Sequence, residues 1–178
     1  MRLVVLASGR GSNFKAIVEA IQNKKLNAEV IHLICNKLQA GCLEIAAQNR
    51  ISFTVEKDHV KILTLLKSLN PDFICLAGYM RILPAEIIAA FPNKILNIHP
   101  SLLPKYKGLD AQKQALEAGE TESGCTVHYV TEELDGGEIL GQIKVAILPN
   151  DTVESLSERI LEKEHELYVG VLKKISIL

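Results

Sequence analysis

Hydrophobic and polar residues alternate along the chain in blocks that predict strands and helices in turn. Residues 3–7 form a short apolar run typical of a buried strand, and apolar residues at helical spacing follow in 14–21. This pair of patterns then recurs, so we expect an α/β fold with a mostly parallel, Rossmann-like sheet flanked by helices. The predicted strands of the first half are 3–7, 30–34, 52–55 and 73–77, and its predicted helices are 14–21, 41–48 and 62–69.

The second half predicts more extended chain and one long helix. That helix is expected to begin at Asp151, with Glu154 three residues on as in a variant of the capping box. Apolar residues recur on one of its faces, and its charged residues, among them Glu164, should face solvent. The other predicted elements are strands at 124–130 and 139–147, a short helix that begins near Pro84, and a helix at 111–118.

The composition narrows the class of protein. The chain has 178 residues, enough for a single domain with a substantial core. Lys and Arg number 20 against 21 for Asp and Glu, and this balance argues against a general nucleic-acid or membrane-surface binder. No apolar run approaches the roughly 20 residues of a membrane span. The chain begins directly with a predicted strand, so we expect no signal peptide and a cytoplasmic protein.

The cysteines point to packing rather than to metal binding. They form no C-x-x-C motif, and two of them sit inside apolar runs, so we expect buried free thiols in a reducing compartment and no metal site. The four cysteines are Cys35, Cys42, Cys75 and Cys125.

The stretch 97–104 carries the most informative candidate chemistry. Asn97 and His99 follow an apolar run and, in an extended segment, direct their side chains to the same side. An amide donor and a ring that exchanges a proton near neutral pH could together hold a developing oxyanion. The alternative is an ordinary strand end with a capping Asn and a half-buried His. Of the other histidines, we expect His32 to be structural and His59 to be solvated. His128 shares a face with Thr126, so it could hydrogen-bond within a polar cluster, or it is a structural residue.

Two further loops follow predicted strands, where open sheets bind ligands. The glycine turn at 8–13 leads into a helix, so Gly11, Ser12 and Asn13 could bind a phosphate, or form only a tight turn with a capping Ser. Met80, Arg81, Ile82 and Leu83 form the other loop, whose apolar side chains either build walls for a flat aromatic ligand or seal the core.

A carboxylate near His99 would complete the chemistry. Asp135 precedes two glycines, which is also ordinary turn chemistry, but beside His99 it would favour the imidazolium form and suit a general acid. The chain has no Gly-x-Ser-x-Gly motif and no cysteine motif typical of a nucleophile. We therefore expect direct transfer without a covalent intermediate. Lys105 and Lys107 either meet anionic groups or belong to a solvated basic loop.

These segments, in this order, resemble the folate-dependent phosphoribosylglycinamide formyltransferases of purine synthesis. The matching pieces span nearly the whole chain, and Lys105-Tyr106 followed by Gly108-Leu109 favours the glycinamide member over its transfer-RNA and hydrolytic relatives. The resemblance implies the formyltransferase fold, with an antiparallel addition in the C-terminal half. It also implies a single domain, 1–178, with a phosphate-binding half at 1–95 and a folate-binding and catalytic half at 96–178.

The resemblance also implies roles for individual residues. The catalytic residues would be Asn97, His99 and Asp135, which stabilise the tetrahedral intermediate and move protons. The substrate, phosphoribosylglycinamide, would place its phosphate on Gly11, Ser12 and Asn13 and its amine end near Glu164. The cosubstrate, 10-formyltetrahydrofolate, would contact Met80, Arg81, Ile82, Leu83 and Asn97. No metal is implied, the partners are small molecules, and the Leu103-Pro104 peptide bond is expected to be cis.

The chain departs from the family pattern at a few places. The segment 55–71 is shorter than in many relatives and lacks an Arg that contacts ligand there, with Lys57 a poor substitute. Lys107 and Asp110 stand where many members have Pro and His. Other functions stay open from the sequence: a hydrolase of formylfolate, a noncatalytic nucleotide-binding module, or a structural protein. The sequence fits either a monomer or a homodimer.

Overall fold

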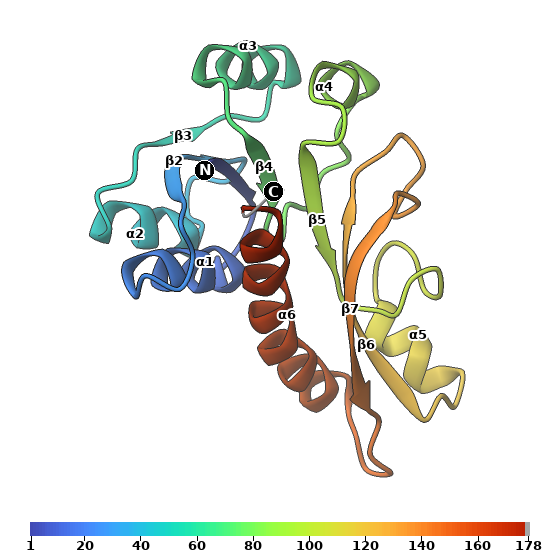
Figure 1. The fold of residues 1–178 in the computed structure, drawn as a ribbon. Coiled ribbons are helices and arrows are strands. Elements are labelled where there is room, and N and C mark those ends of the chain that lie inside the picture. The colour runs from blue at the N-terminus through green and yellow to red at the C-terminus, as the bar shows by residue number, and fades with distance from the viewer. Residues whose placement is uncertain (177–178) are drawn as a thin grey trace.

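The computed structural model describes residues 1–176 and contains one seven-stranded sheet with the order β3-β2-β1-β4-β5-β6-β7 (Figure 1). The strands are β1 Arg2–Ala7, β2 Glu29–Cys35, β3 Phe53–Val55, β4 Phe73–Leu76, β5 Ile95–His99, β6 Glu122–Tyr129 and β7 Ile139–Ala146. The helices are α1 Ser12–Gln22, α2 Gly41–Gln48, α3 His59–Leu69, α4 Ala85–Ala90, α5 Ala111–Glu117 and α6 Val153–Ile175.

The sheet changes direction once. Strands β3, β2, β1, β4 and β5 pair in parallel, whereas β6 runs antiparallel to β5 and β7 runs antiparallel to β6. The predicted fold, a mostly parallel sheet with an antiparallel addition in the C-terminal half, is therefore confirmed. This arrangement brings the carboxyl ends of β1, β4 and β5 to one edge of the sheet, and loops that leave this edge carry most of the candidate residues.

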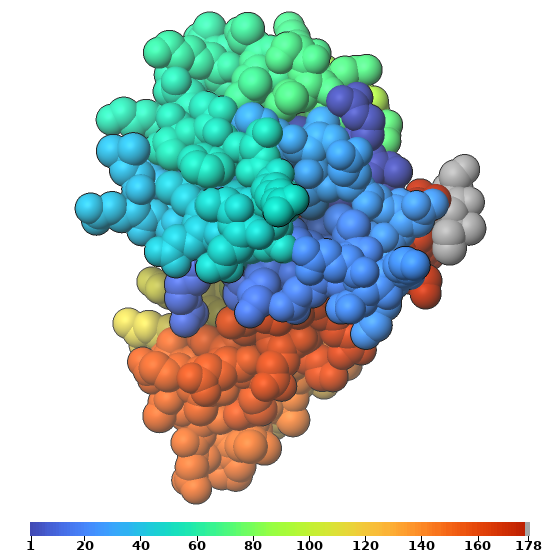
Figure 2. Space-filling model, turned by 90° about the vertical axis from the view of Figure 1, so that its left-hand side faces the viewer, coloured from blue at the N-terminus to red at the C-terminus, as the bar shows by residue number. Residues whose placement is uncertain are grey.

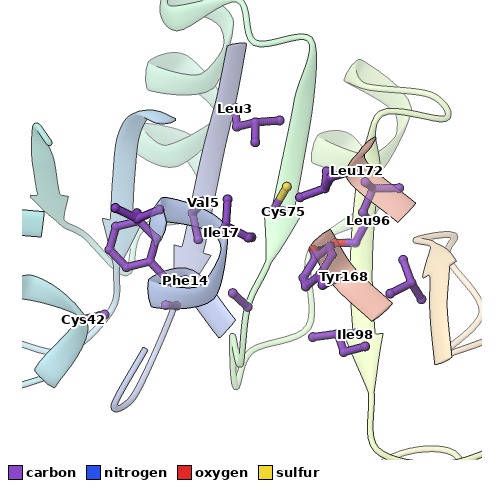
Figure 3. Close-up of a cluster of buried hydrophobic side chains, with 14 of the residues drawn as sticks. Leu3, Val5, Phe14, Ile17, Cys42, Cys75, Leu96, Ile98, Tyr168 and Leu172 are labelled. Carbon is purple, nitrogen blue, oxygen red and sulfur yellow. Dashed lines mark hydrogen bonds between the residues drawn. The ribbon is translucent and has the colours of Figure 1, made fainter. Parts of the chain in front are cut away.

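Two hydrophobic clusters cover the two faces of the sheet. Helices α3 and α4 lie on one face and α1, α2 and α6 on the other (Figure 1). Tyr168 of α6 is fully buried between β4 and β5, and its hydroxyl lies 3.1 Å from the backbone oxygens of Leu76 and Leu96 (Figure 3). The long helix is thereby fixed to the centre of the sheet. In Figure 2, α6 and the β6–β7 hairpin lie directly below the N-terminal elements.

The ends of α6 and α1 differ from the sequence prediction. Helix α6 begins at Val153, with Thr152 as the N-cap and Ser155 as its capping-box partner, so the predicted pair of Asp151 and Glu154 was wrong. Asp151 instead accepts hydrogen bonds from Arg159 and stabilises the preceding turn. At the start of α1, the alternative of a turn with a capping Ser does not hold, because Gly11 occupies the cap position and no side chain caps the helix.

One prediction of solvent exposure was wrong, and a second holds only in part. Glu164 lies on a buried part of α6 and is only 8% exposed, because this stretch of the helix packs against α1. His59 begins α3 and is partly exposed, but its Nε2 is buried without a hydrogen-bond partner. His32, in contrast, is structural as predicted, with its Nε2 2.9 Å from the hydroxyl of Thr54.

Candidate active site

The carboxyl end of β5 positions the two polar residues singled out from the sequence. Asn97 and His99 stand two residues apart on this strand and therefore share a face of the sheet. The antiparallel register with β6 places His128 opposite Asn97 and Thr126 opposite His99. Asp135, in the loop between β6 and β7, completes a cluster of polar side chains at this point.

His99 is buried, and both of its ring nitrogens face hydrogen-bond acceptors. Its Nε2 lies 2.8 Å from the backbone oxygen of Tyr106, and its Nδ1 lies 3.4 Å from Oδ2 of Asp135. A carbonyl oxygen can only accept, so Nε2 must carry a hydrogen. The Nε2 hydrogen is thus fixed by the Tyr106 carbonyl, and Nδ1 is the ring nitrogen that faces the Asp135 carboxylate.

The amide of Asn97 is oriented by two neighbours. Its Nδ2 lies 3.2 Å from Nε2 of His128 and 3.4 Å from Oδ1 of Asp135. His128 donates from Nδ1 to the backbone oxygen of Tyr129 at 2.8 Å, and its Nε2 lies 3.6 Å from Oδ1 of Asp135. A carboxylate oxygen can only accept, so the nitrogen of the Asn97 amide, and not its oxygen, points into the cluster, as an oxyanion donor requires.

Asp135 is held as a carboxylate. Burial raises its pKa, but contact with His128, the N–H of Gly108 at 2.8 Å and the charge of His99 outweigh burial. The pKa of Asp135 therefore lies below its usual value, and the side chain is negative at neutral pH. This negative charge lies 3.4 Å from Nδ1 of His99.

Sequence reasoning left open that His128 belongs to a polar cluster but favoured a structural role, and it did not connect His128 with Asn97. Only the pairing of β5 with β6 puts His128 opposite Asn97, and that register cannot be read from the two strand patterns alone. The backbone groups of Tyr106 and Gly108 were missed for a similar reason, because a loop conformation decides which carbonyl and which N–H face the site.

The glycine turn at the carboxyl end of β1 is shaped for close approach of a ligand. Gly11 has a φ of 79°, and a Cβ added to it would lie 2.7 Å from Cβ of Cys42, so only glycine fits here. The turn leads straight into α1, whose first N–H groups have no partner within the helix. Ser12 and Asn13 stand at this helix end, which is the arrangement that favours an anion.

Asn13 connects this turn to Glu164, which lies 151 residues further along the chain. The Nδ2 of Asn13 donates to Oε2 of Glu164 at 2.7 Å, and the Oδ1 of Asn13 is buried without a partner. Burial raises the pKa of Glu164 to about 7, although the hydrogen bond from Asn13 opposes that shift. Glu164 can therefore exchange a proton near neutral pH, beside a buried acceptor that has no partner in the protein.

The apolar side chains of the loop at 80–83 differ in their surroundings, so some seal the core and others are free to contact a ligand. Leu83 is buried and belongs to the hydrophobic cluster under α3 and α4, so it seals the core. Met80 and Ile82 are 63% and 76% exposed, which leaves their apolar side chains free to contact a ligand. Arg81 donates to the backbone oxygen of Lys57 and so ties the loop to the shortened segment 55–71.

Two further features lie near the site. One is the basic loop with Lys105 and Lys107, and the other is a hydrogen bond that joins the glycine turn at 8–13 to the loop at 80–83. Lys105 pairs with Glu120 and Lys107 with Glu133, each at 2.6 Å, which favours the solvated basic loop over an anion site. The hydroxyl of Ser8 accepts from the backbone N–H of Met80 at 2.8 Å and joins the first turn to the apolar loop. Within residues 1–176, no three His, Cys, Asp or Glu side chains are grouped to hold a metal ion.

Comparison with known proteins finds relatives over nearly the whole chain. Residues 1–172 match the family model described as Formyl transferase. A phosphoribosylglycinamide formyltransferase from Haemophilus influenzae is 43% identical over 97% of this chain and 85% of its own length. A trifunctional purine biosynthetic protein adenosine-3 from Drosophila pseudoobscura pseudoobscura is 47% identical over 92% of this chain, which spans only 13% of that longer protein.

Solved structures give the same picture. The crystal structure of glycinamide ribonucleotide transformylase 1 from Symbiobacterium toebii has a TM-score of 0.95 at 39% identity and covers 97% of this chain and 86% of its own. A formyltetrahydrofolate deformylase from Pseudomonas syringae has a TM-score of 0.91 at only 26% identity, and the match covers 97% of this chain and 60% of the deformylase. No helix among residues 1–176 combines the length and the apolar character that crossing a membrane requires.

Proposed function

This chain belongs to the formyl transferase family, and on that premise we propose that it formylates the amine of phosphoribosylglycinamide. The formyl donor is 10-formyltetrahydrofolate, the products are formylated substrate and tetrahydrofolate, and the reaction is a step of purine biosynthesis. The observation that carries the proposal is the donor pair formed by Nδ2 of Asn97 and Nδ1 of His99 beside the Asp135 carboxylate. The identity of 43% to a formyltransferase of similar length supports it.

The chemistry follows from these three side chains. The substrate nitrogen forms a bond to the formyl carbon, and the formyl oxygen becomes an oxyanion that accepts hydrogen bonds from Asn97 and protonated His99. Asp135 orients His99 and supports its charge. The bond between the formyl carbon and the folate nitrogen then breaks. The proton lost by the attacking amine passes, through Asp135 and water, to the departing folate nitrogen, so that protons balance over the reaction.

The binding residues are those of the two loops beside the cluster. Gly11, Ser12 and Asn13 receive the substrate phosphate at the start of α1, where free N–H groups and the helix dipole favour an anion. Glu164, tied to Asn13, faces the amine end of the substrate.

The folate ring lies against the apolar loop and reaches Asn97. The exposed side chains of Met80 and Ile82 form its walls. Arg81 and Leu83 contribute main-chain contacts, since the Arg81 side chain is held by Lys57 and the Leu83 side chain is buried in the core.

The test is an assay that follows loss of the formyl group from 10-formyltetrahydrofolate, with and without phosphoribosylglycinamide. We expect turnover that requires the amine, and a loss of roughly 10²- to 10³-fold in kcat for His99→Ala, the cost typical of removing an oxyanion donor. His32→Ala, a histidine of β2 outside the cluster, is the matched control and should retain activity. Amine-independent loss of formyl would identify a hydrolase, and a folded wild type without turnover would refute the proposal.

A further inference from the structure

A buried hydrogen-bond network anchors the loop that holds His99. Its centre is Thr126 of β6, which is fully buried directly opposite His99 in the sheet. The Thr126 hydroxyl donates to the backbone oxygen of Ser101 at 2.6 Å and accepts from the backbone N–H of Leu103 at 3.1 Å. The side chain of Gln142 donates to the same hydroxyl at 2.9 Å and to the backbone oxygen of Leu103 at 2.9 Å.

This network uses the full capacity of the hydroxyl group. A threonine hydroxyl has one hydrogen to donate and two lone pairs, and all three are engaged here. Two of the three bonds go to the backbone of residues 101–103, so the position of that backbone is fixed against β6. The third bond, from Gln142, ties the same point to the edge strand β7.

The anchored backbone leads directly to the group that orients His99. Ser101, itself buried, donates from its hydroxyl to the backbone oxygen of Lys105 at 2.6 Å, and the next backbone oxygen, that of Tyr106, accepts from Nε2 of His99. A shift of residues 101–103 therefore moves the acceptor that holds the His99 ring and keeps a hydrogen on Nε2. Small displacements of this kind are costly, since about 1 Å of misplacement can lower a rate by roughly 10²-fold.

We propose that Thr126, with Gln142 as its outer partner, is a positioning residue for His99 and acts through the loop at 101–106. The inference rests on the proposed function, since it assigns to the loop the task of presenting Nδ1 of His99 to the reacting formyl group. Neither side chain makes a hydrogen bond to the side chains of Asn97, His99 or Asp135.

The first experiment compares Thr126→Val with Thr126→Ser in the formyl-transfer assay. The valine variant keeps the shape but loses all three hydrogen bonds, so kcat should fall by roughly 10-fold or more while KM for both substrates stays within about 2-fold. The serine variant keeps the hydroxyl and should restore most of the lost rate. A folded valine variant with wild-type kcat overturns the proposal.

Gln142→Met provides a second variant in case the valine variant does not fold, because Gln142 lies at the exposed edge of the network. Its kcat should fall by about 3-fold or more, since one of the three hydroxyl bonds and one backbone bond are lost. Lys144→Met is the matched control on the same strand and the same face, with a side chain that is 70% exposed and bonds only Glu122. If Gln142→Met behaves like Lys144→Met, the network does not position His99.

Nitrogen NMR of the His99 ring separates this inference from the proposed function. Wild-type protein should show a hydrogen on Nε2, because the Tyr106 carbonyl oxygen accepts from it, and Thr126→Val should shift this Nε2 signal. If wild type is inactive but Thr126→Val still shifts the His99 Nε2 signal, the proposed function is refuted and the positioning network is retained. An active wild type whose His99 signals are unchanged in folded Thr126→Val would refute the network alone.

Discussion

Glu164 should make the stability of the protein depend on pH in a defined direction. Its pKa is about 7 in the folded protein against an ordinary value of 4.5, because the side chain is buried. A raised folded pKa means that the stabilising contribution is fully present below pH 4.5 and is lost as pH rises through 7. The difference of about 2.5 pH units corresponds to about 3 kcal/mol at 1.36 kcal/mol per unit. Glu164→Gln removes the titration and keeps the size of the side chain.

Urea unfolding at pH 5 and pH 8 measures this contribution directly. The free energy of unfolding of Glu164→Gln minus that of wild type should increase by about 2.5 kcal/mol between these pH values, since only wild type must bury a charge at pH 8 and the unfolded side chain is already largely ionised at pH 5. Other titrating groups cancel in the difference, including His165, whose pKa is lowered by burial. Glu162→Gln, on the exposed side of the same helix, should show no such increase. A difference that stays constant with pH would refute the reasoning for Glu164.

Two further substitutions test the loops. Gly11→Ala forces an alanine into a φ of 79° and a Cβ within 2.7 Å of Cys42, so a thermal melt should show a loss of about 1–3 kcal/mol. Its KM for phosphoribosylglycinamide should also rise, and an unchanged melt would contradict the steric argument. Ile82→Ser removes an apolar side chain that is 76% exposed, so stability should stay within about 0.5 kcal/mol. KM for the folate should rise by about 3-fold or more if this side chain contacts the ring, and an unchanged KM would exclude that contact.

The order of strands and helices could be predicted because each element carries its own periodic pattern. The apolar runs at β1, β2 and β4 predict buried strands. Because these strands alternate with helices along the chain, they predict a parallel sheet. The reversal at β6 follows from no such pattern, and we took it from a family resemblance. The caps of α6 were mispredicted because Asp151, Thr152 and Glu154 all suit a helix start, and only the backbone angles choose among them.

The candidate site was predictable only in part, for a related reason. Asn97 and His99 share a strand, so alternation alone puts their side chains on one face. His128 and Glu164 join the site through contacts between distant segments, β5 with β6 and α1 with α6. A charged residue on an amphipathic helix looks solvated in sequence. Only the packing of α6 against α1 turns Glu164 toward Asn13.

The two buried carboxylates of the site are shifted in opposite directions, and the cause lies in their partners. Asp135 has donors on several sides, from Gly108, Asn97 and the His99 ring, so its charge is stabilised more than burial destabilises it. Glu164 has only the amide of Asn13, and burial dominates. Two acids whose pKa values are shifted in opposite directions by their environments are suited to different roles. Asp135 is negatively charged beside His99 in the free protein, whereas Glu164 can be neutral until a ligand with a positive amine arrives and favours its ionised form.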